Sequence, residues 1–288
     1  MKIYRVASRL LLVAGLCIGG TAAADHDHDD GLVLGDSLAF SYIASVGYEY
    51  FYINPENFIG FANDLGYMLD LDVANAGCPG ETTGSFLSST APDNGCRTFR
   101  SYFPLHVDYT STQLAFATTY LTSHRHVRLV TITLGANDGF LLEASCANPS
   151  PAVTAACIEK GAPAVIAAVA GNIKQILADL RGTGYQGAIV LMNYYSLDYS
   201  DAAGTALTEA LNAGIAAPAA AYEAVVADVF SAFKTVASEP AFGDKTCNTG
   251  LLNPDVHNPF VCDVHATQTG HRLIAQTIAQ AYRSLDHH

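Results

Sequence analysis

Short apolar runs alternate along the chain with longer segments of helical periodicity. Five runs rich in Leu, Val and Ile predict buried strands, within residues 31–34, 71–74, 126–134, 187–193 and 224–230. Apolar residues recur at helical spacing over residues 57–69, 111–123, 163–180, 203–216 and 269–285. Strands that alternate with helices of this length are typical of a parallel sheet covered on both faces. The pattern therefore predicts a three-layer α/β/α domain, flavodoxin-like, around a central parallel sheet of about five strands.

Two stretches interrupt this alternation. Residues 143–161 and 238–264 are rich in loop-forming residues and in Cys, and both are predicted to be mostly loop. An aromatic segment also follows the first strand, with Tyr42, Tyr48, Tyr50, Phe51, Tyr52 and Phe58. These rings could line a pocket for an acyl chain or a sugar, or they could pack against the first helix, and the sequence leaves both interpretations open.

The first 24 residues have the pattern of a secretory signal. Lys2, Arg5 and Arg9 precede an apolar run over residues 10–20, and small residues follow up to Ala24. The run is too short to cross a bilayer, and no later segment is expected to do so. We therefore expect cleavage near Ala24, a disordered leader over residues 25–30 and a single domain over residues 31–288, in an extracellular or periplasmic location. The His-Asp leader could hold a metal loosely, although a solvated tail is the simpler interpretation.

The chain that remains after the signal is strongly acidic. It has 11 basic and 27 acidic residues, a net charge of −16, because the signal carries three cations and no acid. Such an excess argues against nucleic acid and anionic membrane surfaces as partners. The whole sequence of 288 residues is 50% hydrophobic and 14% charged, which suits one large core. We expect a soluble monomer.

Six cysteines remain once the signal, which contains Cys17, has been removed. Their clustering favours three sequential pairs, each closing a short loop: Cys78 with Cys96, Cys146 with Cys157, and Cys247 with Cys262. A structural zinc site is the rival interpretation, but the chain has no Cys-x-x-Cys spacing. Disulfides agree with an oxidising destination.

Polar blocks follow three of the predicted strands, and a histidine precedes the last helix. The blocks are Gly35-Asp36-Ser37-Leu38, Asn75-Ala76-Gly77, Gly135-Ala136-Asn137-Asp138 and Asp263-Val264-His265. In an open α/β sheet, ligands bind where the carboxyl ends of the strands meet. In this order the blocks resemble the SGNH hydrolase superfamily, the GDSL-type esterases and lipases, and in particular its secreted bacterial members with three disulfides.

The resemblance implies a division of roles among these residues. Ser37 would be the nucleophile and His265 the general base that takes its proton. The backbone N–H groups of Ser37 and Gly77 and the side-chain amide of Asn137 would form the oxyanion hole. The resemblance implies no metal and no cofactor. Asp36 and Asp138 belong to the blocks but are predicted to be turn and hydrogen-bonding residues.

The last block departs from the usual Asp-x-x-His-Pro of the family. Cys262 stands three residues before His265, and Ala266 takes the place of the proline. Asp263 is the nearest carboxylate and our first candidate for orienting the imidazole, although a backbone carbonyl could also do so. His257, which follows Asp255-Val256, is the one competing histidine. His106, His124, His126 and His271 match no motif and are predicted to lie on the surface or to serve packing.

The sequence thus predicts a secreted serine hydrolase that cleaves carboxylic esters through an acyl-enzyme on Ser37, with His265 as general base. Short-chain esters, acylglycerols or phospholipids, and acetylated polysaccharide all remain open as substrates. A non-catalytic protein that binds a glycan or lipid on the same fold is the alternative, but such a protein has no need of the reactive residues. The chain lacks a Gly-x-Ser-x-Gly elbow, a Walker loop and a His-Glu-x-x-His motif.

Overall fold

Five parallel strands form the central sheet of this computed structural model, which describes residues 29–44, 49–255 and 262–287. The strands are β1 (Asp29–Gly35), β2 (Leu71–Asn75), β3 (Val127–Thr133), β4 (Ala188–Met192) and β5 (Ala224–Ala227). Their order in the sheet is β2-β1-β3-β4-β5. This is the predicted flavodoxin-like arrangement, in which the strand order reverses between β1 and β3. Ligands bind outside the carboxyl ends of the strands at such a reversal, and β1 ends next to Ser37.

The first strand begins earlier than the sequence suggested. Asp29 pairs with Leu71 of β2, and Asp30 pairs with Asp72. The carboxylate of Asp29 also forms an ion pair with Arg128, at 2.8 Å. These two residues therefore belong to the sheet and not to a leader, while residues 1–28 lie outside the described residues.

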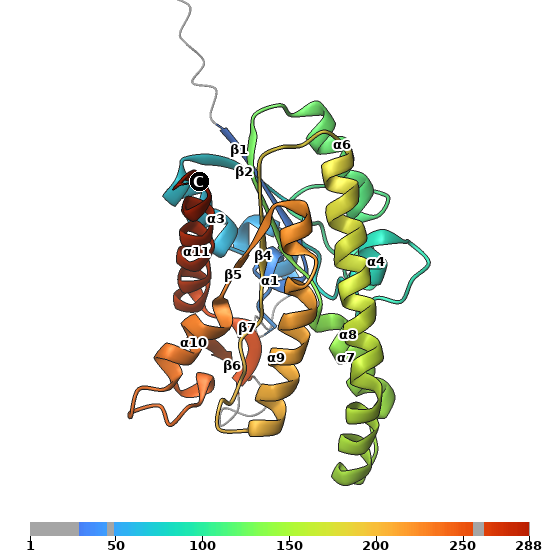
Figure 1. Cartoon of the computed structure of the whole chain (residues 1–288), viewed down its shortest axis with the longest axis vertical. Coiled ribbons are helices and arrows are strands. Elements are labelled where there is room, and N and C mark those ends of the chain that lie inside the picture. The colour runs from blue at the N-terminus through green and yellow to red at the C-terminus, as the bar shows by residue number, and fades with distance from the viewer. Residues whose placement is uncertain (1–28, 45–48, 256–261, 288) are drawn as a thin grey trace, which may run out of the picture.

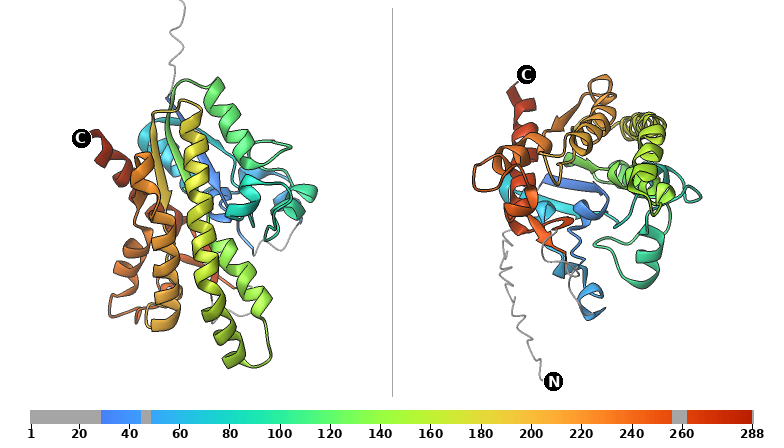
Figure 2. Two further views of the ribbon diagram at one scale, coloured as in Figure 1. Left: turned by 45° about the vertical axis from the view of Figure 1, so that its right-hand side comes forward. Right: turned by 90° about the horizontal axis from the view of Figure 1, so that it is seen from below.

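Helices cover both faces of the sheet (Figures 1 and 2). On one side, α11 (Gln268–Arg283) packs against α3 (Phe61–Leu69), α10 (Val229–Ala237) and the strands β4 and β5. On the other side, α8 (Pro151–Gly182) packs against α6 (Gln113–Ser123) and α9 (Ala202–Ala216). The shorter helices are α1 (Ser37–Phe40), α2 (Glu49–Tyr52), α4 (Thr83–Leu87), α5 (Cys96–Tyr102) and α7 (Ala136–Cys146). The predicted three layers are thus confirmed.

Residues 143–161, which we expected to be mostly loop, are largely helical. α7 extends to Cys146, and α8 begins at Pro151 and runs through Pro163. Proline is tolerated in the first turn of a helix because its missing N–H would have no intrahelical acceptor there, and the alanine-rich sequence that follows favours helix. Figure 1 shows the resulting antiparallel hairpin, which projects beyond the sheet.

By length and composition alone, α8 is long and apolar enough to cross a membrane, contrary to our expectation for the segments after the signal. Its C-terminal half, however, is part of the core. The side chains of Val169, Ile173, Ile176, Leu177 and Leu180 are fully buried. We therefore describe α8 as a helix of the sheet's outer layer.

The region 238–264 contains more regular structure than predicted. β6 (Leu252–Pro254) and β7 (Cys262–Ala266) form a two-stranded antiparallel ribbon. The structure joins the cysteines in three disulfides, Cys78–Cys96, Cys146–Cys157 and Cys247–Cys262. The last of these fixes the start of β7.

The aromatic segment forms a second, smaller core. Phe40 and Phe58 are fully buried, with their ring centroids 4.8 Å apart, and Tyr42, Phe51 and Tyr52 pack around them. These rings therefore pack together, and the ring of Tyr42 also lies edge-on to that of His265, with the centroids 5.0 Å apart. Tyr50 is 81% exposed and Tyr48 lies outside the described residues.

Candidate functional site

Ser37 is the first residue of α1, immediately after the carboxyl end of β1. Asp36 caps this helix, because its carboxylate accepts a hydrogen bond from the backbone N–H of Leu38 at 3.0 Å. The same carboxylate accepts hydrogen bonds from the hydroxyls of Tyr194, at 2.5 Å, and Thr133, at 3.2 Å. Asp36 therefore fixes the turn that presents Ser37. Burial raises the pKa of Asp36 to about 6, although these hydrogen bonds oppose the shift.

Asn137 lies in the first turn of α7, beyond the end of β3. Its side-chain nitrogen donates to the backbone carbonyl of Glu81 at 3.0 Å, and its oxygen accepts from Asn94 at 2.8 Å. An amide nitrogen carries two hydrogens, so one remains for a ligand. The next residue, Asp138, accepts hydrogen bonds from the backbone and hydroxyl of Thr83, as expected for a structural carboxylate.

His265 lies on β7, with Asp263 two residues before it. Alternate residues of a strand point to the same face, so the Asp-x-His pattern places the carboxylate beside the imidazole. The Nδ1 atom of His265 lies 2.9 Å and 3.0 Å from the two carboxylate oxygens of Asp263. The backbone of β7 is itself held by Tyr195, whose hydroxyl donates to the carbonyl of Val264 at 2.5 Å.

One pocket of about 340 Å³ brings these elements together. Ser37, Asn137 and His265 all line it, as do Asp36 and Tyr194. Ser37, Asn137 and His265 come from blocks that are far apart in the sequence. The fourth block, Asn75-Ala76-Gly77, contributes no described residue to the pocket. Among the described residues that line it, none comes from the loop after β2, which carries Gly77.

Gly77 is packed beneath α1. Its N–H donates to the side chain of Asn75 at 2.9 Å, and the amide of Asn75 donates to the carbonyl of Ala39 at 2.8 Å. A Cβ atom on Gly77 would lie 2.5 Å from the backbone nitrogen of Phe40, so only glycine allows this close approach. Asn75 thus joins the loop to α1, and the Gly77 N–H is already engaged.

Gly80 is a second glycine of the same loop, to which the sequence had assigned no role. It lies in a turn closed by the hydrogen bond from the Glu81 N–H to the Cys78 carbonyl, with a φ of +87°. Within residues 29–44, 49–255 and 262–287, its own N–H meets no acceptor. The next residue is Glu81, whose backbone carbonyl accepts the hydrogen bond from the Asn137 side chain. The Pro79-Gly80 pair, a strong turn signal, could have identified it.

The order of these blocks and the fold agree with one known family. The family described as GDSL-like Lipase/Acylhydrolase matches residues 33–273. The chain belongs to the GDSL-like lipase/acylhydrolase family. The matched range includes Ser37, Asn137 and His265. No curated protein matches the sequence.

Solved structures of GDSL-type and related enzymes share this fold at low sequence identity. Phospholipase A1 from Streptomyces albidoflavus NA297 is 16% identical, with a TM-score of 0.56 over 88% of this chain and 99% of that chain. A lipase from a goat rumen metagenome is 15% identical, with a TM-score of 0.54 over 88% and 97%. An acetylxylan esterase from Geobacillus stearothermophilus is 13% identical, with a TM-score of 0.51 over 88% and 94%. At these identities the similarity establishes the fold alone.

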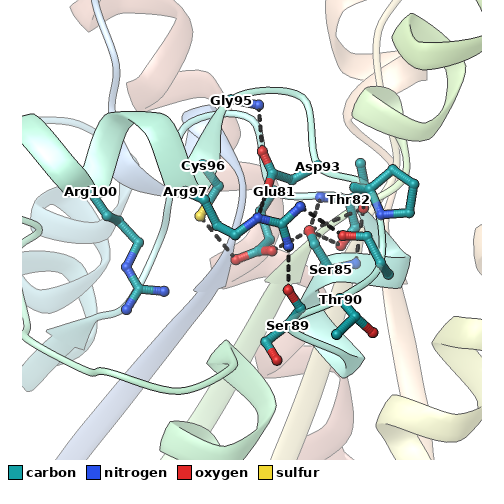
Figure 3. Close-up of polar contacts among 12 residues, drawn as sticks. Glu81, Thr82, Ser85, Ser89, Thr90, Asp93, Gly95, Cys96, Arg97 and Arg100 are labelled. Atoms are coloured by element: carbon teal, nitrogen blue, oxygen red, sulfur yellow. Dashed lines mark hydrogen bonds and ion pairs between the residues drawn. The ribbon is translucent and has the colours of Figure 1, made fainter.

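In this GDSL-family chain, a buried carboxyl supports the loop after β2. Glu81 is 3% exposed, and its carboxylate contacts the hydroxyl of Ser85 and the sulfur of Cys96, which lies 3.4 Å away (Figure 3). Gln113 donates to it at 3.2 Å and also to the carbonyl of Gly35 at 3.0 Å. Glu81 therefore links the loop to the end of β1. Although Glu81 and both sulfurs of the Cys78–Cys96 pair lie within 4.8 Å of one another, the disulfide leaves no thiolate to bind a metal.

Replacing Glu81 by glutamine is expected to remove a pH dependence of folding. Burial raises the pKa of Glu81 from 4.5 to about 7. Between these values the unfolded chain releases the proton while the folded protein keeps it, so the stability that this group contributes is present below pH 4.5 and is lost as pH rises to 7. Urea unfolding at pH 4.5 and pH 8 should show Glu81→Gln gaining about 3 kcal/mol relative to wild type across this interval.

The control for this measurement is Glu209→Gln, on the exposed surface of α9. Its stability should follow that of the wild type at both pH values. The opposite result would be an equal change in the free energy of unfolding between pH 4.5 and pH 8 for Glu81→Gln and the wild type. It would show that the Glu81 carboxyl is ionised in the folded protein as readily as in the unfolded chain.

The histidines without a motif take the structural roles that were predicted. His124 and His126 are exposed, and the ring of His106 contacts the carbonyl of Phe40 at 3.1 Å. His271 lies on α11 with its side chain buried, and this burial lowers its pKa to about 3. None of these four lines the pocket that contains Ser37. His257 lies outside the described residues.

Proposed function

We propose that this protein is a serine hydrolase of carboxylic esters, with Ser37 as nucleophile, His265 as general base and Asp263 as the group that orients His265. Membership of the GDSL-like lipase/acylhydrolase family supports ester hydrolysis. The observation that carries the proposal is the meeting of Ser37, Asn137 and His265 in one pocket, with the carboxylate of Asp263 on Nδ1 of the histidine.

The contact with Asp263 assigns the protons of His265. A carboxylate only accepts hydrogen bonds, so the Nδ1 atom beside it must carry a hydrogen. In the neutral ring the Nε2 atom is then unprotonated and can accept the proton of the Ser37 hydroxyl. When the imidazole becomes positively charged, the same carboxylate stabilises it.

The reaction then proceeds in two halves. The Ser37 oxygen attacks the acyl carbon while its proton passes to Nε2 of His265, and the carbonyl oxygen becomes an oxyanion. The C–O bond to the alcohol breaks, and that alcohol leaves with the proton from His265. Water then attacks the acyl-enzyme by the same route, giving a carboxylic acid and free Ser37.

The oxyanion requires donors that are already in position. The second amide hydrogen of Asn137 is one of them, and the N–H of Ser37, which has no intrahelical acceptor in the first turn of α1, is another. Gly77 would supply the third, as the family resemblance implies, if it exchanged its hydrogen bond to Asn75 for one to the substrate. Gly80 is the other candidate in that loop, with its N–H already available.

We also propose that the protein is exported. Its three disulfides fit an extracellular or periplasmic location, where such bonds persist. The signal over residues 1–24 and its cleavage near Ala24 lie outside the described residues. Mass spectrometry of the protein recovered from the medium or periplasm would locate the mature N-terminus.

A fluorophosphonate probe tests the nucleophile directly. We expect one adduct per chain, on Ser37, because an activated serine oxygen displaces fluoride from phosphorus while His265 takes its proton. Tandem mass spectrometry of the labelled peptide identifies the residue. The rate of p-nitrophenyl ester hydrolysis should fall in proportion to the fraction of Ser37 that is labelled.

The variant His265→Ala serves as the control, since it keeps the serine but removes its base, and labelling should slow greatly. An adduct on another residue, or ester hydrolysis that survives complete labelling of Ser37, would contradict the proposal. Binding of a glycan or lipid without turnover of any ester would favour the non-catalytic alternative.

A further inference from the structure

The pocket at Ser37 continues as an apolar groove away from the sheet. Beyond Asn137 it passes between α7, α8 and α9. Its walls carry half-buried apolar side chains, whose exposed parts face the groove: Phe140, Ile158, Val165, Ile166, Leu207 and Leu211. We name this space the α7–α9 groove. None of the rings Tyr42, Phe51, Tyr52 and Phe58 lines it.

The α7–α8 hairpin gives this groove its length. α7 leads away from Asn137, the Cys146–Cys157 disulfide joins the two helices near the tip, and α8 returns (Figure 2). Between Ile158 and Ile166, both of which line the groove, an α-helix rises roughly 12 Å. The whole pocket, including its part at Ser37 and His265, has a volume of about 340 Å³, which equals that of roughly ten water-sized groups at about 30 Å³ each. A medium-length hydrocarbon chain fits these dimensions.

Acidic residues predominate among the charged side chains that line the pocket and its groove. Asp36, Glu143, Asp198 and Asp201 line the pocket, and no Lys or Arg is among its described lining residues. Lys245 lies 3.8 Å from the carboxylate of Asp198, but the other three carboxylates have no such ion pair among the described residues, so a phosphate or carboxylate on the part of the ligand that enters here would be disfavoured. The groove is therefore suited to an uncharged chain.

We propose that the α7–α9 groove binds the acyl chain of the substrate, and that the substrates are neutral esters of medium-chain acids, up to about ten carbons. This assignment rests on the function proposed above. The groove is continuous with Ser37 and His265, and we assign it to the side of the ester that becomes the acyl-enzyme. Each added methylene that enters the groove should raise kcat/KM by roughly threefold to fourfold until the groove is full.

Gly139 provides a way to block the groove without disturbing its walls. It lies on α7 and lines the groove, and a Cβ atom built there has no neighbour within 4 Å. Gly139→Leu should therefore fill the groove from an open position. Gly171, on the exposed surface of α8, also has no neighbour within 4 Å of a Cβ atom and lines no part of the pocket. Gly171→Leu is the matched control.

The experiment measures kcat/KM for p-nitrophenyl acetate and octanoate with the full chain and both variants. Octanoate has six more carbons than acetate, so at threefold to fourfold for each we expect the wild type to prefer octanoate by about 10³-fold. Gly139→Leu should lose roughly tenfold or more on octanoate and stay within about threefold on acetate, whereas Gly171→Leu should match the wild type on both. Retained acetate hydrolysis shows that the variant is folded.

Ile158→Phe extends the measurement to the far end of the groove, where Ile158 lies on α8. It should lower activity on decanoate and leave butyrate unchanged. A parallel series of acetate esters with lengthening alcohols separates the two sides of the ester. If Gly139→Leu lowers kcat/KM only in the alcohol series, the acyl assignment is wrong. A wild-type preference for an acyl chain that ends in a carboxylate would also overturn it.

Failure of this inference differs from failure of the proposed function. If the wild type hydrolyses acetate through Ser37 but Gly139→Leu keeps the wild-type ratio of octanoate to acetate, the esterase function stands and the groove assignment is wrong. If the wild type hydrolyses no ester of any length, both are wrong.

Discussion

Replacing Ser37 by alanine is expected to lower kcat on p-nitrophenyl esters by about 10⁴-fold or more, because no nucleophile then remains to form an acyl-enzyme. The fold should be almost unaffected. The Ser37 hydroxyl makes no hydrogen bond to another residue in the described part of the chain, so its removal leaves no buried group without a partner. Steady-state kinetics and a thermal melt of the same preparation measure both effects.

Ser145→Ala is a suitable control for this variant. Ser145 also lies on a short helix, but it is exposed and its hydroxyl donates only to the carbonyl of Leu142 within α7. Its activity should stay within about twofold of the wild type. Activity of Ser37→Ala above about a tenth of the wild-type value would remove Ser37 from its role.

The second large effect is expected for Asp263→Asn. The carboxylate holds the Nδ1–H of His265 and stabilises the imidazolium that forms as the proton leaves Ser37. An amide at this place has no charge, and it can turn its N–H groups toward Nδ1 and so favour the wrong tautomer. We expect kcat to fall by about 10²–10⁴-fold, with little change in KM.

The matched control is Asp72→Asn, since Asp72 is also an aspartate within a strand but lies exposed on the edge strand β2. A loss of less than about threefold in Asp263→Asn would mean that a backbone carbonyl orients His265 instead. The two variants together therefore decide the alternative that the sequence left open.

Much of the site could be predicted because its parts are local. The turn of Gly35, Asp36 and Ser37 after a short apolar run is a strand end and a helix start in any fold of this class. The Asp263-Val264-His265 spacing gave the correct neighbour for the imidazole even though the residues form a strand and not the predicted loop. A strand serves the same purpose, because residues two apart share a face.

Other features depended on contacts that the sequence does not reveal. Residues 143–161 contain two prolines and two cysteines and suggested a loop, but the packing of α7 against α8 and the Cys146–Cys157 bond make a helical hairpin of them. Gly77 was assigned a free N–H because of its place in a motif. That N–H instead donates to the side chain of Asn75, two residues earlier, and the amide of the same side chain donates to Ala39 of α1, more than thirty residues away.

The sequence by itself determined the alternation of strands and helices, the polar residues at the strand ends and the cysteines close enough to pair. These follow from side-chain periodicity and turn chemistry, which act over a few residues. Only the tertiary structure decided which loops share the pocket of Ser37, that the aromatic segment is a core, and that the apolar groove runs between α7, α8 and α9. Those outcomes depend on which faces of distant elements bury one another, and burial is a property of the assembled layers.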